Sequence, residues 1–288
     1  MTQHAPLFIV LLPVSAALLC MLFSRIQKNL GSWIVIASIA GAFLSAVSSL
    51  QQVIADGGKA LHYWMGNWQP PLGIEFVIDP ISGALAVLIT FIALLGSLYS
   101  LPFVKEEGWL HIGGYYTLYG LMTVGMCGMV ITGDVFNLYV FLEVMSLSGY
   151  GLIAIGGKKS MLAAFRYLLI GTIGASLYLL GVGYMYALTG TLNMADMAVR
   201  AAEFLNYPLF ALALACFVVG FRIKMALFPL HGWQPDAYNY AHPGSAAFIA
   251  GCMSKVPAYA MIRFLFFMFG VDTPAVKAAL DVLGILGV

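Results

Sequence analysis

Repeated apolar runs of about 20 residues constrain this chain more than any other feature of its sequence. A helix that crosses the hydrocarbon core of a bilayer needs about 20 mostly apolar residues. On that measure we expect about eight membrane-spanning helices, and a ninth that begins near Pro274. The expected spans cover residues 7–23, 32–53, 81–101, 115–131, 136–155, 168–188, 209–228 and 245–269. The sequence therefore predicts an all-α, polytopic membrane protein.

The composition agrees with a lipid environment. Hydrophobic residues make up 62% of the chain and charged residues only 9%, whereas a soluble domain has about 45–50% and about 25%. The net charge of +1, without a basic patch, argues against a nucleic-acid partner. The cysteines lie inside apolar runs without CxxC spacing, so we expect neither a disulfide framework nor a metal site, and no cofactor. These cysteines are Cys20, Cys127, Cys216 and Cys252.

The basic residues of the loops predict the orientation of the chain. Loops on the cytoplasmic side of a membrane carry an excess of lysine and arginine. The loops after the first, third and fifth spans hold Arg25, Lys28, Lys105, Lys158, Lys159 and Arg166, whereas the opposite loops hold Lys59, Arg200 and Lys277. We therefore expect an inner (plasma) membrane protein whose amino terminus lies outside. The first apolar run lacks a basic leader, which favours a retained helix over a cleaved signal.

The longest connection between spans runs from Ala55 to Asp79. It carries Trp64 and Trp68, followed by two prolines. Tryptophan is enriched where a membrane meets water. We expect this segment to be an interfacial loop capped by aromatic side chains.

An acidic residue within the fifth span is the first candidate for function. Glu143 lies seven residues after Phe136, where that span begins, and is therefore roughly 10 Å deep at about 1.5 Å per residue. An ionisable residue at the centre of a span costs at least ~2.5–3.5 kcal/mol. Glu143 is either a structural carboxylate satisfied by Ser146, Ser148 or a lysine, or a functional group. The cost of its depth favours a function.

Two lysines beside expected helix breaks complete the candidate set. Lys224 precedes Pro229, and Lys255 precedes Pro257. Proline removes a backbone donor and clashes with the preceding turn, and the polar segment after Pro229 predicts a broken helix there. The freed backbone groups are tolerated in a membrane only if they are buried in protein or face water. Either lysine could instead extend its ammonium group to the headgroups, an interpretation that fits Lys224 better than the deeper Lys255.

An acid and two amines on neighbouring helices are suited to proton transfer. Burial disfavours the charged form of lysine, and a nearby carboxylate favours it. A lysine in such a setting changes its charge when its partner moves or changes protonation. His231, just beyond the break, either relays protons between the lysines or makes hydrogen bonds within the loop.

For three further polar residues, a structural explanation is about as plausible as a functional one. Asp134 stands where the fifth span begins, so it either caps that helix or belongs to the relay. Arg166 either pairs with a carboxylate or follows the positive-inside preference. His242 flanks the expected break on its far side.

Several of these segments resemble a known family. The runs GDVFNLYVFLEVMSLSGYGLIAIGGKK, YALTGTLNMADMA, KMALFPLHGWQPDAYNYAHP and SKVPAYAMIRF, with GIEFVIDPIS upstream, are similar to the proton-conducting antiporter-like subunits of complex I, membrane-bound hydrogenases and Mrp-type antiporters. These runs are most similar to the D-type subunits of Mrp-type Na+/H+ antiporters. The resemblance implies that Glu143 is the key glutamate of the fifth helix and Lys224 the lysine of the broken seventh helix. It likewise implies that His231 is the histidine after that break and Lys255 the lysine of the eighth helix.

The resemblance also implies a domain organisation. Residues 1–110 would hold three amino-terminal spans, 111–270 the first five-helix repeat, and 271–288 the start of a second repeat. Family members are usually longer, so we expect a chain truncated after the first repeat, either a split-gene half or a fragment.

The function implied by the resemblance is Na+/H+ exchange by one membrane subunit among several, with protons and sodium as the transported ions. Alternatives are a proton-pumping subunit of a complex I-like NADH dehydrogenase or hydrogenase, and a non-transporting scaffold. A redox subunit is a further alternative. No histidines face each other within a span, which argues against haem, whereas a quinone contact stays open. The sequence shows no nucleotide loop, iron–sulfur cysteines or catalytic triad, so we expect no catalysis by this chain alone.

Overall fold

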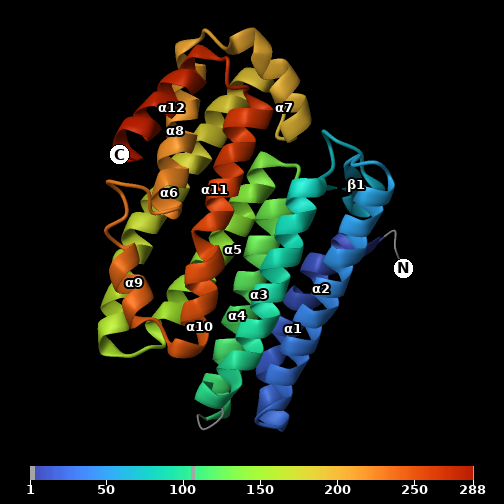
Figure 1. The fold of residues 1–288 in the computed structure, drawn as a ribbon, viewed down its shortest axis with the longest axis vertical. Coiled ribbons are helices and arrows are strands. Elements are labelled where there is room, and N and C mark those ends of the chain that lie inside the picture. Colours follow the sequence, from blue (N-terminus) through green and yellow to red (C-terminus); the bar gives the residue numbers. More distant parts are fainter. Residues whose placement is uncertain (1–3, 105–107, 288) are drawn as a thin grey trace.

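The computed structural model describes residues 4–104 and 108–287 and is almost entirely helical (Figure 1). Lys105 lies outside the described residues. Within them, 7 helices are long and apolar enough to cross a membrane. Six are regular: Ala5–Ile26 (α1), Leu30–Ala55 (α2), Pro80–Val104 (α3), Trp109–Ile131 (α4), Val135–Ala154 (α5) and Lys158–Thr189 (α6). The prediction of an all-α, polytopic membrane protein is confirmed, with slightly fewer spans than expected.

The remaining spanning helix, Pro243–Met268, is irregular. It consists of α10 (Pro243–Phe248), a π-helical turn η4 (Ile249–Met253), α11 (Lys255–Ile262) and a second π-helical turn η5 (Arg263–Met268). A π-helical turn inserts a residue into the helix and is frequent at functional sites.

The difference in the number of spans comes from two short helices. The expected span over residues 209–228 is α8 (Pro208–Lys224), of only 17 residues. It ends before Pro229, because Ala226 adopts a left-handed backbone with φ of 56°. The chain becomes helical again at α9 (Gln234–Tyr240), so the predicted break near Pro229 is present. The ninth expected span is α12 (Pro274–Gly287), of 14 residues.

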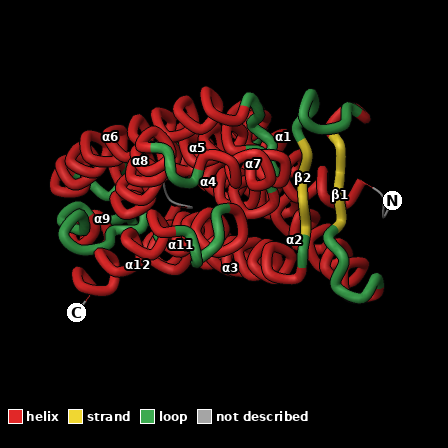
Figure 2. The backbone as a smooth tube through the Cα atoms, turned by 90° about the horizontal axis from the view of Figure 1, so that it is seen from above, coloured by secondary structure: helices red, strands yellow, loops and turns green. Residues whose placement is uncertain are grey.

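The long connection after α2 is not an irregular loop. It forms an antiparallel hairpin of β1 (Leu61–Trp64) and β2 (Glu75–Ile78), in which Leu61 pairs with Ile78 and Trp64 with Glu75 (Figure 2). A short 3-10 turn, η2 (Met65–Asn67), follows β1. The prediction of a loop was wrong at the strands, where aromatic and β-branched residues favour pairing. Trp68, in the connection between the two strands, is 65% exposed.

The helices pack around α4, the most buried of the spanning helices. α1, α3 and α5 lie against it, and α6 packs on both α5 and α8. The seam between α6 and α8 is close, because a Cβ atom on Gly220 would stand 2.8 Å from the carbonyl oxygen of Gly174. Small residues allow such an approach between helices in a membrane.

The two ends of the molecule differ (Figure 1). At one end lie the β-hairpin and an amphipathic helix that we did not predict, α7 (Met194–Ala201), followed by η3 (Ala202–Phe204). We call this the hairpin end. At the other, the α9 end, lie α9 and the first turns of α6 and α10. The three-part division at residues 110 and 270 stays a prediction.

Candidate functional site: a buried lysine and its partners on α5

Lys224 is the last residue of α8 and is fully buried, with 0% exposure. Its ammonium group donates hydrogen bonds to Ser146 Oγ at 2.7 Å and to the Tyr150 hydroxyl at 3.4 Å. The nearest carboxylate oxygen, Glu143 Oε1, lies 4.0 Å from Lys224 Nζ. The lysine that the sequence singled out therefore meets the predicted glutamate inside the protein.

All three partners of Lys224 come from α5. Glu143, Ser146 and Tyr150 are spaced by three and four residues, so they lie on one face of that helix. Ser146 donates its own proton to the carbonyl oxygen of Leu142 at 2.7 Å. Its lone pairs are therefore left to accept a proton from the ammonium group. This hydroxyl holds Lys224 in place without titrating.

Glu143 is less enclosed than its partner. Its side chain is 26% exposed, whereas its Oε1 atom is buried and accepts no hydrogen bond from the described residues. At 4.0 Å the carboxylate and ammonium groups interact through their charges, beyond the usual length of a hydrogen bond. In a medium of low dielectric constant, the protonation of one group depends on that of the other.

The broken end of α8 is held by side chains that satisfy its carbonyl groups. Trp233 donates from its indole nitrogen to the carbonyl oxygen of Ile223 at 2.9 Å, and Arg222 donates to the carbonyl oxygen of Phe228. Trp233 also stacks on Tyr167, with ring centroids 3.7 Å apart. The break therefore meets the requirement that backbone freed from a helix inside a membrane be satisfied by protein.

Lys255 lies away from this pair. It follows the π-helical turn Ile249–Met253, and its ammonium group donates to the carbonyl oxygen of Ala250. Its side chain is exposed on the surface formed by the described residues, and no hydrogen bond or ion pair described here joins it to Glu143 or Lys224. Pro257 lies in the first turn of α11, where its missing N–H leaves the helix intact. The irregularity of this span thus precedes Lys255 and does not occur at Pro257.

The two candidate histidines occupy different places. His231 is exposed within the break, and its ring lies 5.5 Å from that of Phe228. No contact within the described part of the chain places it between the lysines. His242 caps α10, because its Nδ1 accepts from the N–H of Gly244 at 3.2 Å.

The remaining candidates, Asp134 and Arg166, make structural interactions that the sequence analysis gave as alternatives, helix capping and pairing with a carboxylate. Asp134 accepts from the N–H of Asn137 at 2.6 Å and caps α5. Burial raises the pKa of Asp134, and the hydrogen bond from Asn137 offsets part of that rise. Arg166 pairs with Asp236 at 2.8 Å, and both side chains are well exposed, so this ion pair contributes little to stability.

Sequence reasoning missed Tyr150 as a partner of the lysine. The helical spacing from Glu143 was the available signal, because residues seven apart lie on one face. Glu75 was also passed over. It is 4% exposed at the hairpin end and would have stood out as an acid within an apolar strand. Among the described residues, no group of three or more His, Cys, Asp and Glu side chains is arranged to hold a metal ion.

The contact between Ser146 and Lys224 gives a testable prediction. A hydrogen bond to a charged group contributes about 1.5–3 kcal/mol, so Ser146→Ala is expected to reduce the free energy of unfolding by about that amount. Ser148→Ala is the matched control, because Ser148 is equally buried on α5 but bonds only to backbone carbonyl groups. Thermal unfolding of the purified proteins in detergent measures both. Equal losses of stability would show that the contact with Lys224 has no special weight.

Comparison with known proteins places these observations in context. Residues 132–288 match the family model described as NADH:quinone oxidoreductase/Mrp antiporter, transmembrane. The N subunit of NADH-quinone oxidoreductase from Desulforudis audaxviator is 45% identical over 99% of this chain and 56% of its own length. The D subunit of the Na(+)/H(+) antiporter from Bacillus subtilis is 32% identical over 92% of this chain and 53% of its own.

Solved structures agree with these matches. A chain of the membrane-bound sulfane sulfur reductase, an archaeal respiratory membrane complex, superposes with a TM-score of 0.91 at 30% identity and covers 99% of this chain and 57% of its own length. A chain of the Mrp complex from a Dietzia species superposes with a TM-score of 0.82 at 27% identity, over 99% and 54%. The chain spans about half the length of the curated relatives that it matches.

Proposed function

The chain belongs to the NADH:quinone oxidoreductase/Mrp antiporter transmembrane family, and on this premise we propose that it is a membrane subunit of a multisubunit cation/proton antiporter. In this proposal the chain conducts protons through Glu143, Lys224 and Lys255, and the complex exchanges them for sodium. The relatives named as D subunits of Na(+)/H(+) antiporters support this choice.

One observation carries the proposal: a fully buried lysine at the end of a broken helix faces a glutamate 4.0 Å away. A purely structural lysine at this depth would be costly, since replacing a buried ion pair by apolar residues is often neutral or stabilising. A lysine that gains and loses a proton needs a counter-charge that is near enough to interact with its charge. The counter-charge must also not hold the proton in a direct hydrogen bond. The 4.0 Å separation without a direct hydrogen bond has this property.

The proposal includes a location and partners. The Lys158 and Lys159 loop at the α9 end faces the cytoplasm, so the hairpin end and the amino terminus face outward across the plasma membrane. Other membrane subunits of the complex cover the polar surface around Lys255, because an exposed lysine within a spanning helix is costly in contact with lipid.

A second function is favoured by a separate observation. The relative that is 45% identical is named as the N subunit of NADH-quinone oxidoreductase. In that setting the same residues would conduct protons driven by a redox reaction. Membrane vesicles with no electron donor separate the two functions, because an antiporter exchanges cations for protons under an imposed gradient, whereas a redox pump stays idle.

Lys255→Ala in the complete complex tests the proposed proton path. Everted membrane vesicles are expected to lose cation/proton exchange, measured with a fluorescent pH probe after addition of sodium. Lys277→Ala is the control, because Lys277 is an exposed lysine that pairs with Asp272 at 3.3 Å outside the proposed path. If the Lys255→Ala complex assembles normally and still exchanges ions at the wild-type rate, then Lys255 is not on the path. Loss of assembly itself would favour the scaffold function.

A further inference from the structure

A cavity of about 230 Å³ opens at the hairpin end, outside the lysine site. Its walls come from the β-hairpin, α7 and η5, and its floor comes from α4 and α5. Five polar side chains line it, namely His62, Glu75, Thr132, Tyr259 and Arg263. One water molecule takes about 30 Å³ of liquid volume and needs two to four polar partners. The cavity therefore has both the room and the partners for several water molecules.

Glu75 and His62 form a pair that joins the buried wall of this cavity to solvent. Glu75 Oε1 accepts from the amide of Asn193 at 2.7 Å, and Glu75 Oε2 lies 3.0 Å from His62 Nδ1. The Glu75 side chain is 6% exposed, whereas that of His62 is 48% exposed. Because a carboxylate only accepts hydrogen bonds, the Nδ1–H of His62 donates to Glu75 Oε2, and a proton that binds Nε2 gives the carboxylate a positive partner.

The other charged groups around the cavity already have partners. Arg263 pairs with Asp79 and donates to the Tyr259 hydroxyl. Asp134 caps α5. On α7, Asp196 pairs with Arg200 at 3.0 Å, and this guanidinium group lowers the pKa of Asp196. The Glu75–His62 pair is therefore the acid and imidazole at this cavity that contact each other and reach solvent.

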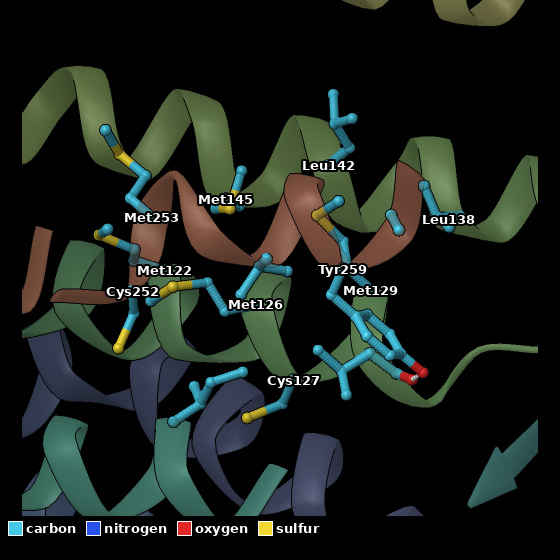
Figure 3. Close-up of a cluster of buried hydrophobic side chains, with 14 of the residues drawn as sticks. Met122, Met126, Cys127, Met129, Leu138, Leu142, Met145, Cys252, Met253 and Tyr259 are labelled. Carbon is cyan, nitrogen blue, oxygen red and sulfur yellow. Dashed lines mark hydrogen bonds between the residues drawn. The ribbon is translucent and has the colours of Figure 1, made fainter. Parts of the chain in front are cut away.

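A layer of sulfur-containing and aliphatic side chains closes the floor (Figure 3). Met129 and Leu138 line the cavity, and Leu142 and Met145 follow Leu138 along α5 with 0% exposure. Met122, Met126 and Met253 pack in the same layer and are equally buried. Glu143 lies five residues beyond Leu138, about 7.5 Å farther along the helix axis at 1.5 Å per residue. The side chains of this layer are thus buried and apolar. Methionine is the most adaptable apolar residue in such a layer.

We propose that this cavity is a water-filled proton vestibule, in which the Glu75–His62 pair exchanges protons with the aqueous phase at the hairpin end. The methionine layer beneath it separates the vestibule from Glu143 and Lys224. The inference rests on the proposed function and deepens it. A protein that moves protons across a membrane needs access from both sides and a barrier that keeps the two from being open together. The vestibule supplies access from the hairpin side, and the methionine layer supplies the barrier.

Thiol labelling in the complete complex tests whether the vestibule holds water. Ala198 lines the cavity on α7, so Ala198→Cys is expected to react with a membrane-impermeant maleimide from the side of the membrane that the hairpin faces. Glu203→Cys, at an exposed position of the same end, is the positive control. The native thiols Cys127 and Cys252 lie in the apolar layer and are expected to stay unlabelled when the sites are mapped by mass spectrometry.

The outcomes separate the vestibule from the proposed transport function. Labelling of Glu203→Cys without labelling of Ala198→Cys would show that water does not enter the cavity and would overturn the inference. If Cys127 or Cys252 were labelled as fast as Ala198→Cys, the methionine layer would not be a barrier to water, and that part of the inference would be wrong. Labelling does not depend on transport. A complex that labels as expected but exchanges no ions would therefore support the vestibule and contradict the proposed transport function.

A proton assay tests the role of the pair itself. Glu75→Gln keeps an acceptor for Asn193 but removes the charge, and the exchange rate is expected to fall about a hundredfold and to lose its dependence on pH at the hairpin side. Glu203→Gln removes an exposed carboxylate at the same end and serves as the control. If Glu75→Gln and Glu203→Gln have the same rates and the same pH profile, then the pair does not exchange protons for the transporter.

Discussion

Replacing Lys224 by methionine is expected to abolish cation/proton exchange while leaving a folded protein in the membrane. The ammonium group of Lys224 is the fully buried charge of the site, and its nearest acidic partner is Glu143. Methionine fills a similar volume without a charge or a proton, and apolar replacements of buried charges are often well tolerated. The proposed proton path would lose the ammonium group at its centre, whereas the packing of the surrounding side chains would be preserved. Sodium-dependent proton movement in everted vesicles, normalised to assembled complex, measures the effect.

The control for this variant is Lys159→Met. Lys159 lies at the α9 end, where its ammonium group stands 5.8 Å from the centre of the Tyr240 ring, so its loss is expected to leave exchange within about twofold of the wild type, since surface substitutions have small effects. Should the Lys224→Met complex exchange ions as fast as the Lys159→Met complex, the buried lysine would be structural and the proposed path would be refuted.

Removing Glu143 is expected to cost both stability and exchange. Glu143→Ala leaves Lys224 buried without its counter-charge, and breaking a buried pair in this way costs about 3–5 kcal/mol. We expect the lower end of that range, because the Glu143 side chain keeps 26% exposure. Exchange is expected to be lost, since the lysine would have no partner to alter its affinity for protons. Thermal unfolding and vesicle assays on the same preparations record the two effects.

The double variant Glu143→Ala with Lys224→Met separates these effects. It removes both charges, so its unfolding temperature is expected to recover most of what Glu143→Ala loses, while exchange stays absent. A double-mutant cycle then gives the coupling energy of the pair. Additive losses of stability, with no recovery, would mean that the 4.0 Å contact carries no coupling. Recovered exchange would contradict the proposed roles of both residues.

The sequence predicted the structure correctly wherever one free-energy cost, such as that of a charge in lipid or of proline within a helix, decided the outcome. Lipid tolerates few charges, so the apolar runs located the spanning helices, and the few charges within them located Glu143 and Lys224. Proline and the polar residues around His231 located the break of the helix after α8. Each of these inferences depends on the local sequence alone, which explains why they needed no knowledge of the tertiary structure.

The rest depends on contacts between distant segments. The hairpin pairs Leu61 with Ile78, and its short, half-buried strands gave only a weak pattern. Tyr150 became a partner of Lys224 only because the lysine side chain at the end of α8 reaches the face of α5 that carries Tyr150. The exposure of Lys255 follows from which helices cover its face. Pro257 was expected to break its helix, yet it lies in a first turn that tolerates proline because of a π-helical turn upstream.

The close seam between α6 and α8 has a consequence for the position of Lys224. A Cβ atom on Gly181 would meet the Phe217 ring at 3.0 Å, and one on Gly174 would meet Ile223 at 2.9 Å. The backbone of α8 is therefore locked to its neighbour along much of its length. The regular helix ends at residue 224, and the irregular stretch 225–233, which contains the left-handed Ala226, follows it. Lys224 is thus the last residue of the helix held against α6, and the irregular backbone begins at the next residue.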